Sequence, residues 1–343
     1  TQHSPVNAHI TSCLLGGALG DSVGLPSEGM NARRIARLRS GPLRQSLVFG
    51  RGMVSDDTEH AVMTLLSLHE CDGDVHRFTK QLARRLRWWF AAIPAGIGLA
   101  TARSIIKLWL GCSPEKSGVF SAGNGPLMRA PVIGVWFADQ PQQRRQWIHA
   151  STAITHRDPR AEEAAHLIAE AAAMAVKPCG NLTEILVRLE QLVVSEEMRI
   201  RFAQLREHLA ARKSVAEFAD SFSRRRGYVS GFAPDTAAVA IYAWLHHRGD
   251  FTQTIEAVIR AGGDTDTVAF VAGSLAGAEV GIHGLNHTWL ATLSDYPLSA
   301  AYLQSLTDHP RQTFPRWPIL IVRNVFFFLI VLTHGFRRIF PPY

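Results

Sequence analysis

The chain has 343 residues, of which 47% are apolar and 19% are charged. This composition supplies enough apolar material for a large core and excludes a globally disordered chain. The net charge of +7 makes acidic ligands and polyanionic surfaces plausible partners, although we interpret the arginine clusters, among them 224–226, mainly as solvated helix faces.

The cysteine pattern argues against a zinc site and against a disulfide framework, because no CxxC pair occurs. The four cysteines are Cys13, Cys71, Cys112 and Cys179. Residues 1–10 are polar and contain no apolar run, so they do not resemble a secretory signal. We therefore expect a protein of a reducing, cytoplasmic compartment.

Helical periodicity dominates the chain, and alternating apolar–polar runs that would indicate strands are scarce. Helices are predicted over residues 58–70, 160–176, 235–246 and 267–281. Asp56 or Asp57 is placed to cap the first of these, and Asp235 follows Pro234 at the start of the third. The pattern predicts one compact all-α domain.

Glycine-rich segments are interpreted as loops between these helices, where functional residues usually lie. They cover residues 16–29, 41–52, 111–125 and 227–231. No linker divides the chain, so a single catalytic domain is predicted over residues 1–309.

Residues 310–343 are predicted to form a C-terminal apolar helical extension packed on that domain. Residues 318–332 read PILIVRNVFFFLIVL, an apolar run interrupted by Arg323 and Asn324. A bilayer-spanning helix needs about 20 apolar residues, so the uninterrupted part, 325–332, is too short and we expect no stable membrane insertion. An interfacial anchor, assisted by Arg337 and Arg338, is the alternative.

Two acidic motifs each stand directly ahead of a predicted helix. They read Ser55-Asp56-Asp57-Thr58-Glu59 and Gly262-Gly263-Asp264-Thr265-Asp266-Thr267. Ordinary helix caps use the same residue types. However, hard cations such as magnesium and manganese also prefer such oxygen ligands, and carboxylates that converge would repel one another unless cations lay between them. If the two motifs meet, two divalent ions are the natural number.

A third motif is a glycine-rich loop that leads into an apolar segment. It reads Ser121-Ala122-Gly123-Asn124-Gly125-Pro126-Leu127-Met128-Arg129. Backbone N–H groups in such a loop can hold a pyrophosphate, and Arg129 could add positive charge. A simple turn is the alternative. Together with an acidic metal site, the loop suggests a ligand that carries both a diphosphate and a sugar diol.

These motifs, taken in order, resemble those of the ADP-ribosylglycohydrolase family, which includes the dinitrogenase-reductase-activating glycohydrolases. The resemblance runs from about residue 10 to residue 282. Its motifs are Gly17–Asp21 with Glu28 downstream, Ser55–Thr58, Gly123–Gly125 with Met128 and Arg129, Thr155–His156, Gly227–Val229 and Gly263–Thr267. The resemblance implies a compact, orthogonal multi-helix bundle that removes ADP-ribose from a modified acceptor by cleaving the glycosidic bond at ribose C1.

The resemblance also implies a role for each site residue. Two Mg²⁺ or Mn²⁺ ions would be held from one side by Ser55, Asp56 and Asp57, and from the other by Asp264, Asp266 and Thr267. The substrate would contact Ser121, Gly123, Asn124, Gly125, Met128, His156 and Tyr228, with the diphosphate on the glycine loop, the ribose at the histidine and the adenine at the tyrosine. Glu28 matches a mobile loop glutamate that closes over the site. Glu28, Asp57 and Asp264 are the alternatives for activating the attacking water.

One departure from the family pattern concerns the acceptor. Members that act on ADP-ribosyl-arginine carry an Asp-Ile-Gly whose aspartate receives the guanidinium. The matching stretch here, Pro94-Ala95-Gly96-Ile97-Gly98, has no acid. Arginine is therefore disfavoured as the acceptor, and serine, a phosphate ester, a nucleic-acid base or a free metabolite stay open.

Two other functions fit the same motifs. A catalytically weak module that only binds ADP-ribose would keep the pocket and lose turnover. A two-metal phosphohydrolase acting on nucleotides would also use an acidic cluster, but it would release AMP and ribose phosphate rather than intact ADP-ribose.

Overall fold

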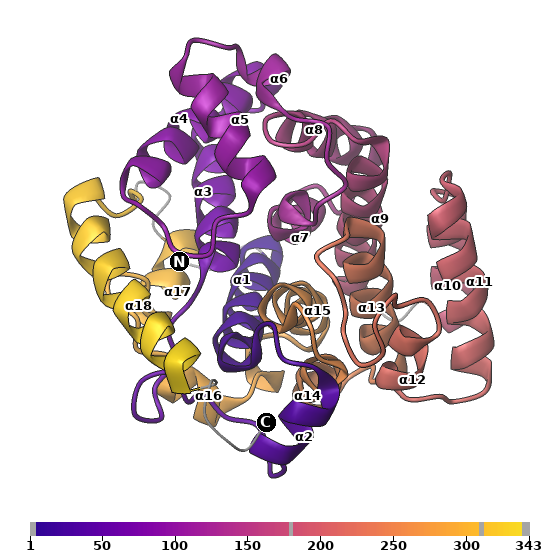
Figure 1. Cartoon of the computed structure of the whole chain (residues 1–343). Coiled ribbons are helices and arrows are strands. Elements are labelled where there is room, and N and C mark those ends of the chain that lie inside the picture. Colours follow the sequence, from indigo (N-terminus) through magenta and orange to yellow (C-terminus); the bar gives the residue numbers. More distant parts are fainter. Residues whose placement is uncertain (1–4, 178–180, 309–311, 338–343) are drawn as a thin grey trace.

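The computed structural model describes residues 5–177, 181–308 and 312–337, and its regular secondary structure within these ranges is helical. Two helices, α1 (Pro5–Gly24) and α15 (Thr265–Val280), run antiparallel through the centre of the molecule (Figure 1). The all-α prediction is confirmed.

Glycines allow α1 and α15 to pack with their backbones almost in contact. A Cβ atom added to Gly16 would lie 2.3 Å from the carbonyl oxygen of Gly273, and one added to Gly24 would lie 2.4 Å from that of Thr265. The interpretation of residues 16–24 as a loop is therefore wrong. These glycines lie inside a buried helix. A side chain at these positions would collide with the backbone of the neighbouring helix, so only glycine fits.

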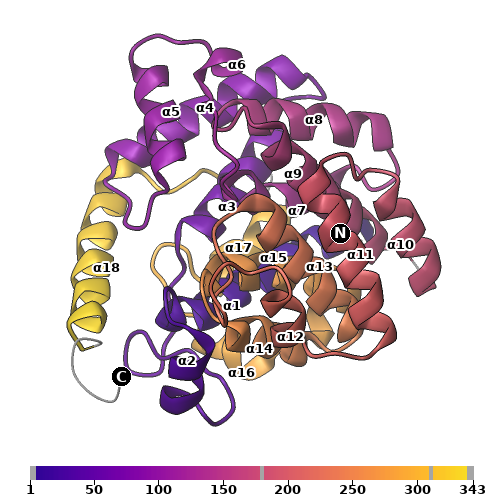
Figure 2. The same ribbon diagram turned by 45° about the vertical axis from the view of Figure 1, so that its right-hand side comes forward.

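The remaining helices form shells around this central pair. Those that contact α1 or α15 directly are α3 (Asp56–Glu70), α7 (Ala130–Trp136), α9 (Pro159–Ala175), α13 (Ala233–His246), α14 (Phe251–Ala261) and α17 (Ala300–Asp308), with the 3₁₀ turns η1 (Leu25–Ser27), η2 (Gly125–Met128) and η3 (Ile282–Gly284). Further out lie α2 (Ala32–Leu38), α4 (Val75–Ala91), α5 (Leu99–Trp109), α6 (Pro114–Ser117), α8 (Pro141–Ala153), α10 (Leu182–Glu190), α11 (Glu196–Ala210), α12 (Val215–Asp220), α16 (His287–Thr292) and α18 (Trp317–Arg337). Figure 2 shows the same arrangement from a second direction.

The four predicted helices are present, with their first residues one or two positions earlier than expected. The capping residues differ as well. Ser55, not an aspartate, caps α3 by accepting a hydrogen bond from the N–H of Asp57. Asp235 lies within the first turn of α13, where its carboxylate receives the guanidinium of Arg201. The cap at Ser55 is local, whereas Asp235 is engaged by a tertiary partner that the sequence pattern does not reveal.

Helix α18 lies along one edge of the molecule, at the left of Figure 1. One narrow face packs on the domain through Leu320, Arg323, Asn324 and Phe327, all of which are buried. The segment Trp317–Phe336 is long and apolar enough to cross a bilayer by length and composition, and 22% of it is buried. The expectation of no membrane insertion was based on the length of the segment 325–332. The helix continues without a break through Arg323 and Asn324, so it is longer than that segment.

The described cysteines, Cys13, Cys71 and Cys112, are free thiols. Cys179 lies outside the described residues.

Candidate active site

The two acidic motifs meet where the N-termini of α3 and α15 converge. Ser55 caps α3, and Asp264 is the residue immediately before α15. The hydroxyl of Thr267 donates a hydrogen bond to Asp57 Oδ2 at 3.2 Å, which joins residues 210 positions apart. Ser55 Oγ donates to the same carboxylate oxygen at 3.1 Å. The motifs therefore form one site, where the positive ends of two helix dipoles partly offset the carboxylate charge.

Asp21, at the end of α1, holds the first motif in place from behind. Its Oδ2 accepts hydrogen bonds from the backbone N–H of Ser55 at 2.9 Å and from the hydroxyl of Thr58 at 2.6 Å. No role of its own was predicted for Asp21. The signal that could have identified it is its position in the Gly17–Asp21 motif, directly after the glycines that draw α1 onto α15.

The carboxylates of the cluster destabilise one another's charged forms. Burial raises the pKa of Asp57 well above its usual range, and the charges of Asp21, Asp56 and Asp264 raise it further. Burial likewise raises the pKa of Asp266, with Glu28 the first of the neighbouring charges that add to it. Buried carboxylates that raise one another's pKa in this way require either protons or cations.

Several oxygens of the cluster are suited to a cation because nothing in the described chain satisfies them. Asp57 Oδ1 and Asp266 Oδ1 are buried and have no hydrogen-bond partner. Such orphaned acceptors cost free energy unless a ligand occupies them. As arranged, no three Asp, Glu, His or Cys side chains among the described residues enclose a common point closely enough for one ion. Any ion here would also need hydroxyl oxygens such as those of Ser55 and Thr267.

The acidic cluster opens into a pocket of about 300 Å³. Its walls include two of the expected metal ligands of the first motif and three of the second, together with the expected loop glutamate, the acid-free segment and two side chains of α18. The lining residues are Leu25, Glu28, Gly29, Ser55, Asp56, Ala95, Gly96, Gly98, Asn124, Met128, Tyr228, Gly231, Asp264, Asp266, Thr267, Phe327 and Val331. Glu28, Asn124 and Met128 thus lie where the expected substrate would be.

The glycine-rich loop is positioned at this pocket, but its amides are not open. The N–H of Gly123 donates to Ser121 Oγ at 3.2 Å, and the N–H of Asn124 donates to the carbonyl of Gly231 at 3.0 Å. The expectation of freed amides is wrong for these two residues, because the loop satisfies its own donors. The side chain of Asn124 instead donates to Asp264 Oδ2 at 2.7 Å, which ties the loop to the second acidic motif.

His156 and Arg129 lie behind this loop and line neither of the two pockets that flank it. A Cβ atom on Gly125 would lie 2.9 Å from His156 Cε1, so the ring packs directly under the loop. Burial, followed by the charge of Arg129, lowers the pKa of His156 to about 3, which keeps the imidazole neutral. Arg129 is fully buried and donates to Ser151 and Thr155. The expectation that Arg129 adds charge for a phosphate is therefore wrong.

A second pocket, of about 600 Å³, adjoins the first and is rich in arginine. The two share Tyr228 and Gly231. Residues lining only the second pocket are Ser121, Ala122, Gly123, Arg160, Glu197, Arg201, Phe222, Arg224, Arg225, Ser230, Phe232 and Asp235. The guanidinium of Arg225 lies over the ring of Tyr228, 5.2 Å from its centroid. Residues 224–226 are solvent-exposed, as expected, but they lie in the loop after α12 and not on a helix face.

Comparison with known proteins identifies this arrangement. A family model described as ADP-ribosylglycohydrolase matches residues 3–318. The chain belongs to the ADP-ribosylglycohydrolase family. It is accordingly an ADP-ribosylglycohydrolase, a hydrolase of glycosidic bonds.

Relatives of this ADP-ribosylglycohydrolase align along most of their lengths. An uncharacterized protein of Archaeoglobus fulgidus is 28% identical over 83% of this chain and 91% of its own. The ADP-ribosyl-[dinitrogen reductase] glycohydrolase of Rhodospirillum rubrum is 24% identical over 84% and 91%. ADP-ribosylhydrolase ARH3 of Gallus gallus is 26% identical over 83% and 89%.

A solved structure supports the fold of this ADP-ribosylglycohydrolase. It is titled "ADP-ribosylglycohydrolase-related protein complex" and superposes with a TM-score of 0.62 at 22% identity, covering 93% of this chain and 98% of that one. The family match ends at residue 318, so nearly all of α18 lies beyond it. Phe327 and Val331, which complete the wall of the acidic pocket, could not have been found from family motifs.

Proposed function

We propose that this enzyme releases ADP-ribose from a non-cationic acceptor by cleaving the glycosidic bond at ribose C1, with two Mg²⁺ or Mn²⁺ ions. The observation that carries the proposal is the pair of adjoining pockets. One holds buried carboxylates with unpartnered oxygens, and the other is lined by arginines and an aromatic ring. A ligand that carries a diol at one end and a diphosphate and a base at the other would match these two pockets, with the diol in the acidic pocket and the diphosphate and base in the arginine-lined pocket.

The ribose next to the scissile bond would occupy the acidic pocket, and the diphosphate would cross at Tyr228 and Gly231. Arg224 and Arg225 would supply positive charge for the phosphates, because the backbone amides of Gly123 and Asn124 are already used. The adenine would then lie between Tyr228 and Phe232, since bases stack on aromatic side chains.

The proposed metal ligands are the six oxygen-bearing side chains already named, Ser55, Asp56, Asp57, Asp264, Asp266 and Thr267. When bound, divalent ions at these residues would fix the ribose diol and stabilise charge as the acceptor departs. The unpartnered Asp57 Oδ1 and Asp266 Oδ1 support this assignment.

The chain's own residues would orient and deprotonate the attacking water. The C1–acceptor bond breaks, the water oxygen bonds to C1, and its proton passes to the protein while the acceptor takes up another. Asn124 and Thr267 hold Asp264 and Asp57 in fixed orientations, so either carboxylate could accept the proton at a defined atom. Glu28 lies in the same pocket, and its charge raises the pKa of Asp266.

The acceptor side of the pocket argues against a guanidinium. Ala95, Gly96 and Gly98 form the wall at the position where arginine-specific relatives place an acid, and Phe327 and Val331 add apolar surface. The wall segment itself contributes no carboxylate that could pair with a guanidinium, and the acids nearest to it are those of the proposed metal site. An uncharged hydroxyl, a phosphate ester or a nucleic-acid base fits better.

Introducing an acid on this wall should change the acceptor preference. We expect Ala95→Asp to raise kcat/KM for ADP-ribosyl-arginine by about tenfold, because one charged pair contributes about 1.4 kcal/mol or more in a partly buried site. Initial rates of ADP-ribose release from modified arginine measure the effect. Ala95→Asn is the control of matched shape, and an equal gain in both variants would contradict the role of charge.

Divalent ions should stabilise the fold, and more strongly at high pH than at low pH. The pKa values of Asp57 and Asp266 are raised, so the metal-free protein loses stability as pH rises through them, and cations relieve that loss. At 100 times the dissociation constant the gain is about 2.7 kcal/mol. Thermal unfolding with Mg²⁺, Mn²⁺ or a chelator at pH 5.5 and pH 8 tests this. A metal effect that is equal at both pH values would contradict the assignment.

The function itself is tested by offering ADP-ribose linked to arginine, serine, terminal phosphate and DNA bases, with and without a chelator. Intact ADP-ribose released only in the presence of metal supports the proposal. AMP and ribose phosphate would instead identify a phosphohydrolase. Tight ADP-ribose binding without turnover on any of these substrates would identify a binding module.

A further inference from the structure

Helix α18 is amphipathic, but its polar side chains face the protein and its apolar side chains face solvent, which is the reverse of an ordinary surface helix. Its charged and amide side chains, Arg323 and Asn324, point into the protein, where they bond to Asp295 and to the carbonyl of Ala92. Its outward half is apolar, with eight large side chains that are each 40 to 65% exposed. These are Ile319, Val322, Val325, Phe326, Phe328, Leu329, Leu332 and Phe336, and together they define the outer face of α18.

The outer face of α18 forms a larger contiguous apolar surface than soluble monomers usually expose to water. Residues 322, 326 and 329 follow helical spacing, as do 325, 328, 332 and 336, so the side chains form adjacent stripes along the helix. A helix of 21 residues is about 31 Å long. Soluble monomers rarely expose contiguous apolar surface of this extent.

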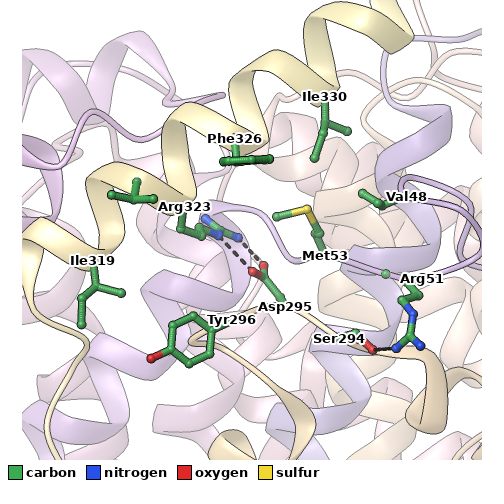
Figure 3. A pocket seen from close by; sticks show the side chains of 12 residues that line it. Val48, Arg51, Met53, Ser294, Asp295, Tyr296, Ile319, Arg323, Phe326 and Ile330 are labelled. Atoms are coloured by element: carbon green, nitrogen blue, oxygen red, sulfur yellow. Dashed lines mark hydrogen bonds and ion pairs between the residues drawn. The ribbon is translucent and has the colours of Figure 1, made fainter.

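The outer face continues into an open apolar groove on one side of α18. Figure 3 shows Phe326 and Ile330 of the helix on one side of this groove and Met53 and Val48 on the other, and the groove's volume is about 470 Å³. At the groove's edge, Phe49 is fully exposed at the tip of a turn closed by hydrogen bonds between Val48 and Arg51. A second apolar element therefore projects beside the helix.

Basic and tryptophan side chains flank this apolar surface. At the start of α18, Trp317 and Arg316 line a pocket together with Arg84 and Trp88 of α4. Residues 309–343 contain no Asp or Glu, and of their five arginines only Arg323, among the described residues, is buried in ion pairs. Arginine and tryptophan at the margins of an apolar stripe are the composition that suits the boundary between lipid headgroups and acyl chains.

We propose that the outer face of α18 and Phe49 dock this enzyme on an anionic lipid bilayer, with the helix lying in the interface. The exposed arginines Arg51, Arg84 and Arg316, which line the pockets beside the helix, supply the charge complementarity, and the largely apolar outward half matches acyl chains better than a hydrogen-bonding protein partner. The helix lies flat rather than across the bilayer, because insertion would remove Arg323 from its buried partners Asp295 and Glu59. This inference does not depend on the proposed substrate.

Co-sedimentation of the full chain with vesicles tests the proposal. The wild type should bind phosphatidylcholine vesicles that contain phosphatidylglycerol more tightly than pure phosphatidylcholine, and less tightly as salt is raised. A Val322→Glu, Phe326→Glu and Leu329→Glu triple variant should bind at least tenfold more weakly. Phe49→Glu, on an exposed turn, should weaken binding independently of the helix.

The matched control places three glutamates on exposed apolar positions of the opposite edge, Val187→Glu, Val194→Glu and Ile200→Glu, around α10 and α11. It should bind vesicles as the wild type does. Four results would overturn the proposal: no vesicle binding, binding that survives the triple variant, a dimer in solution that the triple variant dissociates, or a bound protein that resists alkaline carbonate. The third would assign the face to a second copy of the chain and the fourth to a spanning helix.

Discussion

Replacing Asp57 by asparagine should lower the rate of ADP-ribose release by at least about 100-fold. Asp57 is the residue where the two acidic motifs touch, since it receives both Ser55 and Thr267. The amide keeps the shape of the side chain but removes the charge and half of its acceptor capacity. The measurement is the rate of release at saturating Mg²⁺ from whichever modified substrate the wild type cleaves.

The same substitution should make the metal-free protein more stable, because it removes a buried charge that its neighbours destabilise. Urea unfolding in the presence of a chelator should show a gain of about 1 to 3 kcal/mol. Asp139→Asn, at an exposed carboxylate on the surface, is the control and should alter neither quantity. An Asp57→Asn enzyme that is fully active, or that is less stable without metal, would contradict the site described here.

Replacing Arg323 by methionine should destabilise the protein by about 3 to 5 kcal/mol. The guanidinium of Arg323 lies 2.8 Å from Glu59 Oε1 and 2.5 Å from Asp295 Oδ2, and it also bonds to the carbonyl of Val54. Methionine fills similar space but leaves two carboxylates buried without their cation. Figure 3 shows the pairing of Arg323 with Asp295 beneath α18.

Denaturant unfolding measures this loss, and its pH dependence identifies the cause. Burial raises the pKa of Glu59 and Arg323 opposes that shift, so without the arginine Glu59 should take up a proton more readily. The deficit should therefore be larger at pH 8 than at pH 5. Arg316→Met, just before α18, is the exposed control. An equal loss in the free energy of unfolding for Arg323→Met and Arg316→Met would show that the buried ion-pair network contributes nothing specific to stability.

Activity should also fall in Arg323→Met, because the network reaches the first acidic motif. Asp295 Oδ2 accepts the N–H of Val54 at 3.0 Å, one residue before Ser55. The C-terminal helix thus positions the start of α3 and closes the pocket with Phe327. The C-terminal apolar extension, which the sequence presents only as an addition to the catalytic domain, therefore contributes to the acidic pocket.

The helical fold and the acidic motifs could be predicted because they are local patterns. Apolar spacing identified α3, α9, α13 and α15 to within a few residues, and oxygen-rich residues ahead of two helices predicted where the carboxylates would gather. The glycines of α1 were misread because a glycine in a loop and a glycine at a helix contact look alike until the neighbouring helix is known.

Sequence alone thus determined the positions of the helices and of the acidic motifs proposed to carry the chemistry, since motif and periodicity are properties of neighbouring positions. Tertiary structure decided which side chains are buried, which line the pockets and how α18 is oriented. It buried Arg129 and His156 behind the glycine loop, brought Arg224 and Arg225 to a pocket, and turned α18 so that its arginine points inward and its apolar half outward. Those outcomes depend on contacts between different segments of the chain, such as Arg129 with Ser151 and Arg323 with Glu59, and the local sequence pattern of one segment does not specify them.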